Sequence, residues 1–329
     1  MAAVESVNDV LITEEVPGRS SGLYGVLAVP EGEGPWPGVV MVHEAFGIDD
    51  VMRRQVERMA SAGYVVLMPD LFSAGGVRRC LVATFRALSA GEGRAFADIE
   101  ASRRQLLRRA DCTGSVGVIG FCMGGGFALL AASRGFDAAS VNYGGLPKDL
   151  DRALDGACPV VASYGGKDRA LSGAATKLES ALAAHRIPHD VKLYPEAGHS
   201  FLNPESTGPR LLRPLMSRVM GVGPEPASAA DAWRRIDAWF KEHLGGPTNG
   251  TDLTDSAGAG YSGAMIELPS SYQQYLAGKD QAFVDTVRPV MMQSAAEKLH
   301  GIHIALIPGG VQAHLDDKIP FGQVVEGVD

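Results

Sequence analysis

The chain has 329 residues, of which 46% are hydrophobic, and a formal net charge of −8. This length allows one large domain with an extension, or two domains, and the hydrophobic content is typical of a soluble globular protein. The acidic balance argues against a surface for nucleic acids or anionic membranes, because both need an excess of Lys and Arg. Chemistry on a small molecule is therefore the favoured class of function.

The first residues and the cysteines bear on the compartment. Residues 1–15 carry acids and lack a basic segment followed by an apolar one, so they do not resemble a secretory signal. No apolar run approaches the roughly 18 residues of a membrane span. The four cysteines are too few and too scattered for a disulfide framework or a zinc site. We expect a cytoplasmic protein with free thiols and no membrane partner.

Short apolar runs alternate with helix-length segments along the first two thirds of the chain. Residues 22–29 predict an antiparallel strand at the front edge of a sheet. The runs that follow suit strands buried on both faces of a parallel sheet, and they lie at 39–42, 65–68, 116–119 and 159–162. Helices are expected near 49–62, 93–110, 123–134, 172–185 and 227–243. The alternation predicts an α/β fold with a mostly parallel, doubly wound sheet.

The composition changes after Leu244. Residues 245–260 are rich in Gly, Ser, Thr and Pro and predict a linker, so the expected parts are a domain over 1–244 and a small module over 261–329. Within the module we expect a helix over about 280–299, strands at 303–307 and near 323–325, and a turn at 308–310. The histidines of the module match no metal-ligand spacing, so no metal site is expected there.

A glycine-spaced cysteine follows the strand at 116–119. Gly120, Cys122 and Gly124 form the pattern Gly-x-Cys-x-Gly, in which two glycines allow a sharp strand-to-helix turn with a nucleophile at its apex. The free amides at the start of the next helix favour a thiolate and a nearby oxyanion, so the amide of Met123 is a candidate oxyanion donor. The alternative is a buried cysteine beside a packing turn.

An acid and a histidine follow in the chain order of an α/β-hydrolase. Asp168 comes directly after the strand at 159–163, and His199 follows a further strand candidate at 191–194. Both therefore emerge at carboxyl ends of strands, where the sites of open α/β sheets lie. Each could be an ordinary turn or core residue when taken alone. Their joint order predicts that His199 transfers protons and that Asp168 fixes its tautomer.

A further loop, residues 43–47, follows the strand at 38–42. Its position is that of the loop that supplies the second oxyanion amide, which we assign to Ala45. Glu44 could reach the sulfur of Cys122 and hold it as a neutral, hydrogen-bonded thiol. The alternative is that Glu44 is a solvated loop acid.

Six motifs in this order make residues 8–244 resemble the dienelactone hydrolase family, the carboxymethylenebutenolidase-type α/β-hydrolases. The motifs are His43-Glu44-Ala45-Phe46-Gly47, Pro69-Asp70-Leu71-Phe72, Gly120-Phe121-Cys122-Met123-Gly124-Gly125, Asn142-Tyr143-Gly144, Gly165-Gly166-Lys167-Asp168 and Gly198-His199-Ser200-Phe201.

The resemblance implies a Cys122-His199-Asp168 triad with Glu44 as the resting partner of the thiol. It also implies hydrolysis of an ester or lactone through an acyl-thioester, with a small-molecule substrate and without metal or organic cofactor. Tyr143, Phe46 and Phe201 are expected to line the substrate site. For Tyr143 the alternative is an aromatic that packs at the end of a strand.

Two departures from the family pattern bear on the substrate. The resemblance implies arginines that hold a substrate carboxylate, one after the Pro-Asp-Leu-aromatic motif and one after the catalytic histidine. Here those positions read Ser73-Ala74-Gly75 and Leu202-Asn203. Arg78 and Arg79 could substitute, or could be solvated surface charges. The class of ester or lactone hydrolase is therefore better supported than one named substrate.

Three points stay open in the sequence. Residues 204–226 could form a lid over the site or a packed connection. The chain could also be a non-catalytic hydrolase-fold protein in which Cys122 senses oxidants or ligands and the C-terminal module binds a partner. The intact Asp168 and His199 positions favour the enzyme, because a sensor needs a reactive thiol but no triad order. The sequence does not predict the oligomeric state.

Overall fold

A computed structural model describes residues 4–205, 221–245, 269–277, 300–307 and 310–328, with single positions between 279 and 294. The chain divides into two compact units, Met1–Asp252 and Leu253–Asp329. The boundary falls inside the segment 245–260 that the sequence predicts as a linker. Residues 206–220, most of the predicted lid, lie outside the described residues.

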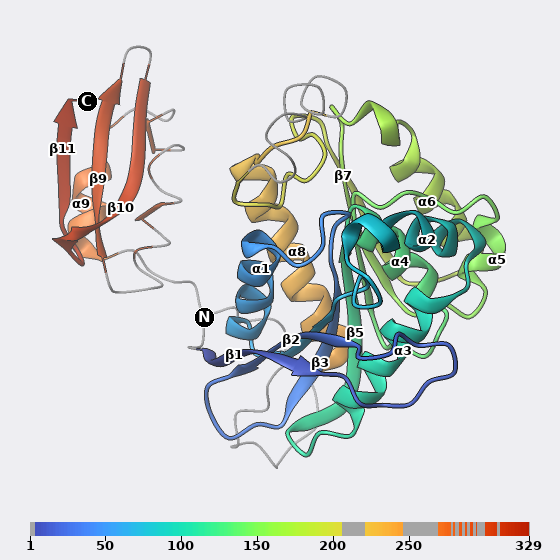
Figure 1. Ribbon diagram of the computed structural model, residues 1–329. Helices are drawn as coiled ribbons and strands as arrows, with labels where there is room; N and C mark the ends of the chain where they lie inside the picture. Colours follow the sequence, from blue (N-terminus) through green and yellow to red (C-terminus); the bar gives the residue numbers. More distant parts are fainter. Residues whose placement is uncertain are drawn as a thin grey trace, which may run out of the picture. The chain divides into compact units, whose positions relative to one another are not determined.

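The first unit is built on an eight-stranded sheet in the order β1-β2-β4-β3-β5-β6-β7-β8 (Figure 1). The first two strands are antiparallel to their neighbours, whereas the remaining pairs are parallel. The predicted α/β class with a mostly parallel sheet is confirmed. The strands are β1 (Val4–Leu11), β2 (Tyr24–Pro30), β3 (Trp36–Val42), β4 (Val65–Pro69), β5 (Cys112–Phe121), β6 (Ala139–Asn142), β7 (Val160–Gly165) and β8 (His189–Tyr194).

Helices cover both faces of this sheet, as Figure 1 shows. Alternate residues of β3 enter different cores, because successive strand side chains point to opposite faces: Val39 and Met41 pack on one side, Val40 and Val42 on the other. One face carries α1 (Asp50–Ser61) and α8 (Pro226–Leu244). The other carries α2 (Val77–Ala90), α3 (Arg94–Leu107), α4 (Met123–Ala131), α5 (Leu150–Leu154) and α6 (Ala174–Ala184), and a short 3-10 helix spans Arg169–Leu171.

The apolar runs correctly predicted central strands of the sheet, whereas elements with few buried residues were missed. The predicted strand at 22–29 is antiparallel, but the prediction that it forms the sheet edge is wrong because β1 pairs outside it. The sequence of β1, VESVNDVL, is partly polar and has no fully buried residue, so it carries no continuous apolar run. The helix α2 was also missed, because it buries only Cys80 and Thr84 along its length.

The second unit contains a three-stranded sheet in the order β10-β9-β11, with β9 (His300–Ile307) in the centre. The strand β10 (Gly310–Pro320) is antiparallel to β9, and β11 (Val324–Val328) is parallel to it. A helix, α9 (Ser270–Leu276), precedes the sheet. The described residues within the predicted helix at 280–299 are all helical. Residues 308 and 309 of the predicted turn lie outside the described residues.

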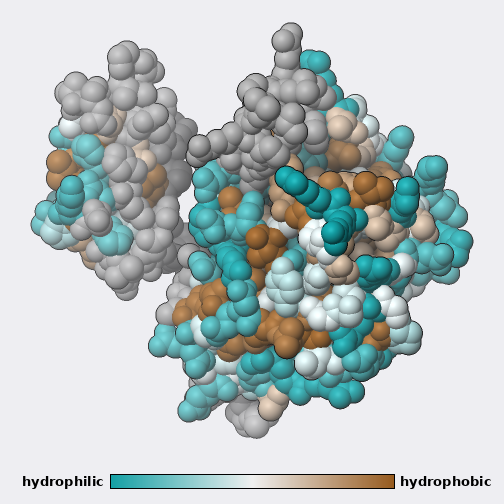
Figure 2. Space-filling view, viewed as in Figure 1, coloured by the Kyte–Doolittle hydropathy of each residue, from teal (hydrophilic) through white to brown (hydrophobic). Residues whose placement is uncertain are grey.

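The surface of the molecule is mixed in polarity. On the face shown in Figure 2, hydrophilic areas alternate with smaller hydrophobic ones. Among the described residues, no helix is both long and apolar enough to cross a lipid bilayer.

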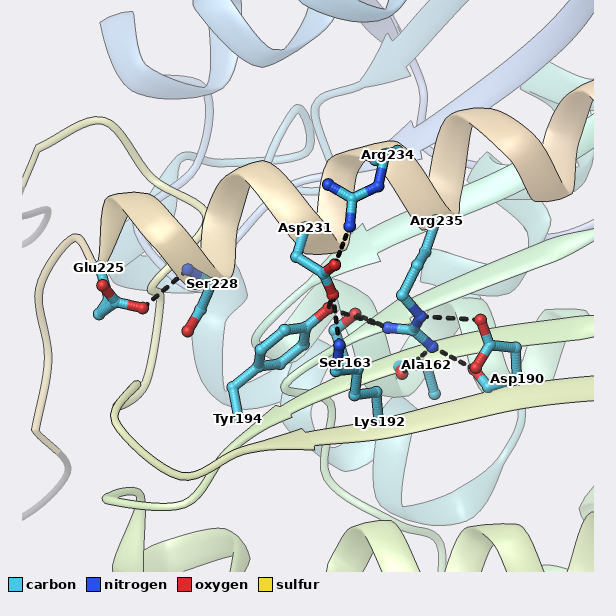
Figure 3. Close-up of polar contacts among 10 residues, drawn as sticks. All are labelled: Ala162, Ser163, Asp190, Lys192, Tyr194, Glu225, Ser228, Asp231, Arg234 and Arg235. Atoms are coloured by element: carbon cyan, nitrogen blue, oxygen red, sulfur yellow. Dashed lines mark hydrogen bonds and ion pairs between the residues drawn. The ribbon is translucent and has the colours of Figure 1, made fainter. Parts of the chain in front are cut away.

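A polar cluster joins α8 to the two strands that carry the loops of Asp168 and His199 (Figure 3). Arg235 donates to the Asp190 carboxylate at 2.7 Å, to the Tyr194 hydroxyl at 3.1 Å and to the Ala162 carbonyl at 3.3 Å. Its side chain is 12% exposed, whereas that of the neighbouring Arg234 is 71% exposed and pairs only with Asp231 among the described residues. Arg235 is therefore a largely buried link between this helix and the sheet.

We predict that Arg235→Met lowers the free energy of unfolding by about 3 kcal/mol, because the Asp190 carboxylate, the Tyr194 hydroxyl and the Ala162 carbonyl lose a charged donor. Arg234→Met is the matched control on the same helix, and its exposed ion pair should contribute less than about 1 kcal/mol. Urea unfolding of both variants measures the difference. Equal losses for the two variants would show that the buried cluster does not stabilise the docking of α8.

Candidate active site

Cys122 lies at a sharp turn between β5 and α4. Its φ of 55° and ψ of −116° are unusual for a residue with a side chain. The flanking glycines are required sterically: a Cβ on Gly120 would lie 1.9 Å from the Gly124 carbonyl oxygen, and one on Gly124 would lie 2.1 Å from the Val42 carbonyl oxygen. The turn has the strained geometry that presents a nucleophile at the top of a sheet.

Asp168 and His199 are in contact at the same end of the sheet. Asp168 follows β7, His199 follows β8, and both side chains are almost fully buried. The Nδ1 atom of His199 lies 2.6 Å from Oδ2 of Asp168. Since a carboxylate accepts, Nδ1 carries the proton, and Nε2 is the atom left for chemistry.

The pKa of His199 reflects three competing influences. Burial lowers the pKa, but the charge of a nearby Cys122 thiolate and the hydrogen bond to Asp168 outweigh burial and raise it above the ordinary value. The Nε2 atom is buried and has no hydrogen bond of good geometry within the described part of the chain. The ring is thus held by Asp168 on one side and left available beside the sulfur on the other.

Glu44 enters the site from the loop after β3. Its side chain is buried, and its Oε1 atom accepts from the Ser200 hydroxyl and from the Asn203 amide, each at 3.0 Å. Ser200 directly follows His199 and has a φ of 60°. The carboxylate of Glu44 is therefore fixed by the same loop that carries the histidine.

Tyr143 lies among these groups at the end of β6. It is fully buried with a φ of 42°, and its ring centroid is 5.1 Å from that of His199. Burial raises the pKa of Tyr143 well above its ordinary value, with further contributions from the charges of Glu44 and Cys122. The hydroxyl therefore stays protonated, and it has no hydrogen-bond partner within the described residues.

The two phenylalanines predicted to bind substrate have different environments. Phe201 is fully buried, with ring centroids 5.7 Å from Tyr143 and 5.1 Å from Tyr194. Phe46 is half-buried in the loop after β3. Phe201 thus supports the ring of Tyr143, and Phe46 is the more accessible of the pair.

The two predicted oxyanion donors emerge from neighbouring strands. Val42 of β3 is in register with Gly120 of β5, so the turns that carry Ala45 and Met123 lie side by side at the carboxyl ends of these strands. Met123 is the first residue of α4, where backbone amides lack partners within the helix. Ala45 lies in a turn closed by a bond of 3.2 Å from the Gly47 amide to the Glu44 carbonyl oxygen.

Sequence reasoning missed three polar residues that organise the site. Ser200 and Asn203 bind Glu44, and the Gln55 side chain on α1 donates to the Leu202 carbonyl oxygen at 3.0 Å. Gln55 offered one signal, since it is a polar residue next to the apolar face of a predicted helix. The partners of Glu44 gave none, because each lies more than 150 residues away along the chain.

The arginines considered as substitutes for a carboxylate clamp do not bind the polar groups of the site within the described residues. Arg78 and Arg79 are both exposed in the first turn of α2. No ion pair or hydrogen bond of either guanidinium to a site residue occurs in the described structure.

Comparison with known proteins identifies relatives of the first unit. The model of the dienelactone hydrolase family matches residues 23–244. A carboxymethylenebutenolidase of Pseudomonas putida is 30% identical over 200 residues, covering 56% of this chain and 83% of the relative. One from Rhodococcus opacus is 29% identical over 224 residues, covering 63% and 81%. The solved dienelactone hydrolase of Anabaena variabilis shares the fold, with a TM-score of 0.54 at 20% identity over 72% of this chain and 99% of that one.

The raised pKa of His199 predicts a pH-dependent contribution to stability. Because the folded pKa exceeds the value of about 6.5 in an unfolded chain, the contribution is complete below about pH 6.5 and is lost as pH rises through the folded pKa. Asp168→Asn removes one cause of the shift. The difference in unfolding free energy between wild type and this variant, measured by urea titration from pH 6 to pH 9, should shrink with rising pH. A constant difference would contradict this assignment.

Proposed function

Because the chain belongs to the dienelactone hydrolase family, whose activity is hydrolysis of esters and lactones, we propose that Cys122, His199 and Asp168 form its catalytic triad. The observation that carries the proposal is the 2.6 Å contact between His199 Nδ1 and Asp168, beside a cysteine at a strained turn. The proposed reaction is hydrolysis of a small carboxylic ester or lactone through an acyl-thioester.

In the first half of the proposed reaction, the proton of the Cys122 thiol passes to His199 Nε2, which gives the thiolate–imidazolium pair in which the pKa of His199 is raised. The sulfur attacks the substrate carbonyl carbon, and the carbonyl electron pair moves onto oxygen. The amides of Met123 and Ala45 stabilise this oxyanion. When the tetrahedral intermediate collapses, the C–O bond breaks, the alkoxide takes the proton from His199, and the acyl group remains on sulfur.

In the second half, His199 Nε2 takes a proton from water as the water attacks the thioester. A second oxyanion forms at the same two amides and collapses with loss of the Cys122 sulfur, which takes the proton back from His199 as the carboxylic acid is released. Asp168 accepts the Nδ1 hydrogen bond throughout and stabilises the imidazolium. Every bond in this cycle is made or broken by groups of the chain, the substrate and water.

We assign Glu44 as the partner of the resting thiol. Its charge and that of Cys122 both act on the Tyr143 hydroxyl, which supports a position of the carboxylate close to the sulfur. Ser200 and Asn203 hold the carboxylate there. Tyr143 is the proposed donor to substrate, because its buried hydroxyl has an unused hydrogen bond.

The surroundings of the site favour a neutral substrate. Asn203 stands four residues after His199, near where the family resemblance implies an arginine, and its amide is engaged with Glu44. Two buried carboxylates, Glu44 and Asp168, already occupy the site. A further carboxylate on the substrate would therefore meet like charges.

We also propose the organisation of the whole chain as a hydrolase domain over 1–244, a linker over 245–260 and a small module over 261–329. The division of the chain near residue 252 supports it. A cytoplasmic location is proposed because all four cysteines are free thiols.

The triad predicts the behaviour of three variants on a panel of aryl esters and lactones. Cys122→Ala and His199→Ala should lose turnover by about 10³-fold or more, since each removes a member of one catalytic unit. Mass spectrometry of the quenched wild type should detect an acyl adduct on Cys122. Asp168→Asn should still form this adduct, but at a reduced rate. Equal residual turnover by wild type and both alanine variants would refute the triad.

The site predicts discrimination against charged lactones. For a matched pair that differs only in a free carboxylate or its methyl ester, kcat/KM should be lower for the carboxylate by roughly tenfold or more, because like charges repel in a desolvated site. Asn203→Arg should reduce the difference in kcat/KM between the methyl ester and the carboxylate. Asn203→Leu, which is neutral like the wild-type residue, should leave that difference unchanged. A wild-type preference for the carboxylate would overturn the assignment of a neutral substrate.

A further inference from the structure

His43 is a fully buried histidine in the active-site region that the proposed reaction does not use. It directly follows β3 and precedes Glu44 and Ala45 in the loop of the oxyanion donor. Its ring centroid is 5.0 Å from that of Phe72, in the loop after β4. A histidine in this environment needs polar partners, because burying an unsatisfied ring nitrogen is costly.

The two ring nitrogens of His43 have partners of opposite kind. Nδ1 lies 2.6 Å from the backbone carbonyl oxygen of Glu44, which can only accept. The backbone amide of Leu71 donates to Nε2 at 3.1 Å, and an amide can only donate. Nδ1 must therefore carry the proton and Nε2 must lack it. The ring is neutral in a single tautomer fixed by two main-chain groups.

Both groups belong to turns that are themselves constrained. The Glu44 carbonyl oxygen also accepts the Gly47 amide, which closes the turn containing Ala45. On the other side, the Asp70 carboxylate accepts from the Phe72 amide at 2.8 Å, and the Ser73 hydroxyl donates to the Asp70 carbonyl at 2.7 Å. His43 is thus the hydrogen-bonded bridge between the loop after β3 and the loop after β4.

We infer that His43 is a positioning residue: a neutral imidazole that anchors the Ala45 turn to the loop after β4 and so holds one oxyanion amide in place. The catalytic consequence rests on the proposed function, whereas the tautomer and the bridge do not.

The charges around His43 test whether the ring could instead be an imidazolium. Asp70 Oδ1 lies 3.7 Å from Nε2, and Asp49 is a second acidic neighbour. Burial is the largest influence and lowers the pKa of His43, against the raising effects of the Glu44 hydrogen bond and of Asp70 and Asp49. A proton on Nε2 would also oppose the Leu71 N–H, so the bridge exists only with the neutral ring.

The first test is NMR of the wild-type protein labelled with 15N-histidine. We expect His43, assigned by comparison with His43→Gln, to show a protonated Nδ1 and an unprotonated Nε2 that do not change between pH 8 and pH 6. A protonated Nε2, or titration at the ordinary histidine pKa, would overturn the bridge. This measurement does not depend on any catalytic activity.

The second test separates oxyanion stabilisation from thiol reactivity. His43→Phe keeps a ring against Phe72 but removes both hydrogen bonds, and we expect kcat for an aryl ester to fall by about 100-fold, as for loss of one oxyanion donor. Alkylation of Cys122 by chloroacetamide should be nearly unchanged, because sulfur displaces chloride there without forming an oxyanion. His43→Gln, which retains an amide donor and acceptor, should recover most of the loss.

The outcomes distinguish this inference from the proposed function. Unchanged kcat in His43→Phe, or a parallel loss of alkylation, would overturn the positioning role while leaving the triad intact. If the wild type hydrolyses no ester or lactone, the proposed function fails, and the NMR result still decides whether the bridge exists.

Discussion

The site depends on how closely α4 can approach the ends of the strands. A Cβ on Gly124 would collide with the carbonyl oxygens of Val42 and His43 at the end of β3, and one on Gly125 would lie 2.7 Å from the Asn142 carbonyl oxygen at the end of β6. The absence of these side chains lets the helix start against both strands. Cys122 is thereby brought beside the loops that carry Glu44 and Tyr143, which are far from it in sequence.

The loop after β8 supplies hydrogen-bond partners for the two carboxylates that are buried in this site. These two carboxylates, Asp168 and Glu44, are buried in the site, and isolated buried charges are strongly destabilising. Asp168 is paired with His199, and Glu44 is hydrogen-bonded by Ser200 and Asn203. One segment of five residues, 199–203, therefore supplies partners for both acids and fixes their relative positions.

The sequence predicted the parts of this arrangement that are encoded locally. The apolar runs located β3 and β5, because a strand buried on both faces is apolar at nearly every position. The glycines around Cys122 located the turn, because the tight backbone packing there excludes side chains. The edge strand β1 and the four-residue β6 were missed, since a strand without buried residues needs no apolar run and a short strand carries little pattern. The bonds of Asn203 to Glu44 and of Leu71 to His43 join distant segments, so no spacing could have predicted them.

The two histidines of the site show how main-chain and side-chain partners separate their roles. His43 lies between a carbonyl oxygen and an amide, so its charged form has no favourable arrangement, and burial lowers its pKa. His199 lies between the Asp168 carboxylate and Cys122, and the charge of a Cys122 thiolate together with Asp168 stabilises an imidazolium, so the pKa of His199 is raised despite similar burial. Only a ring that can hold a proton between two steps can act as the base and then the acid. The partners, and not the burial, thus select His199 for proton transfer and leave His43 to hold the backbone in place.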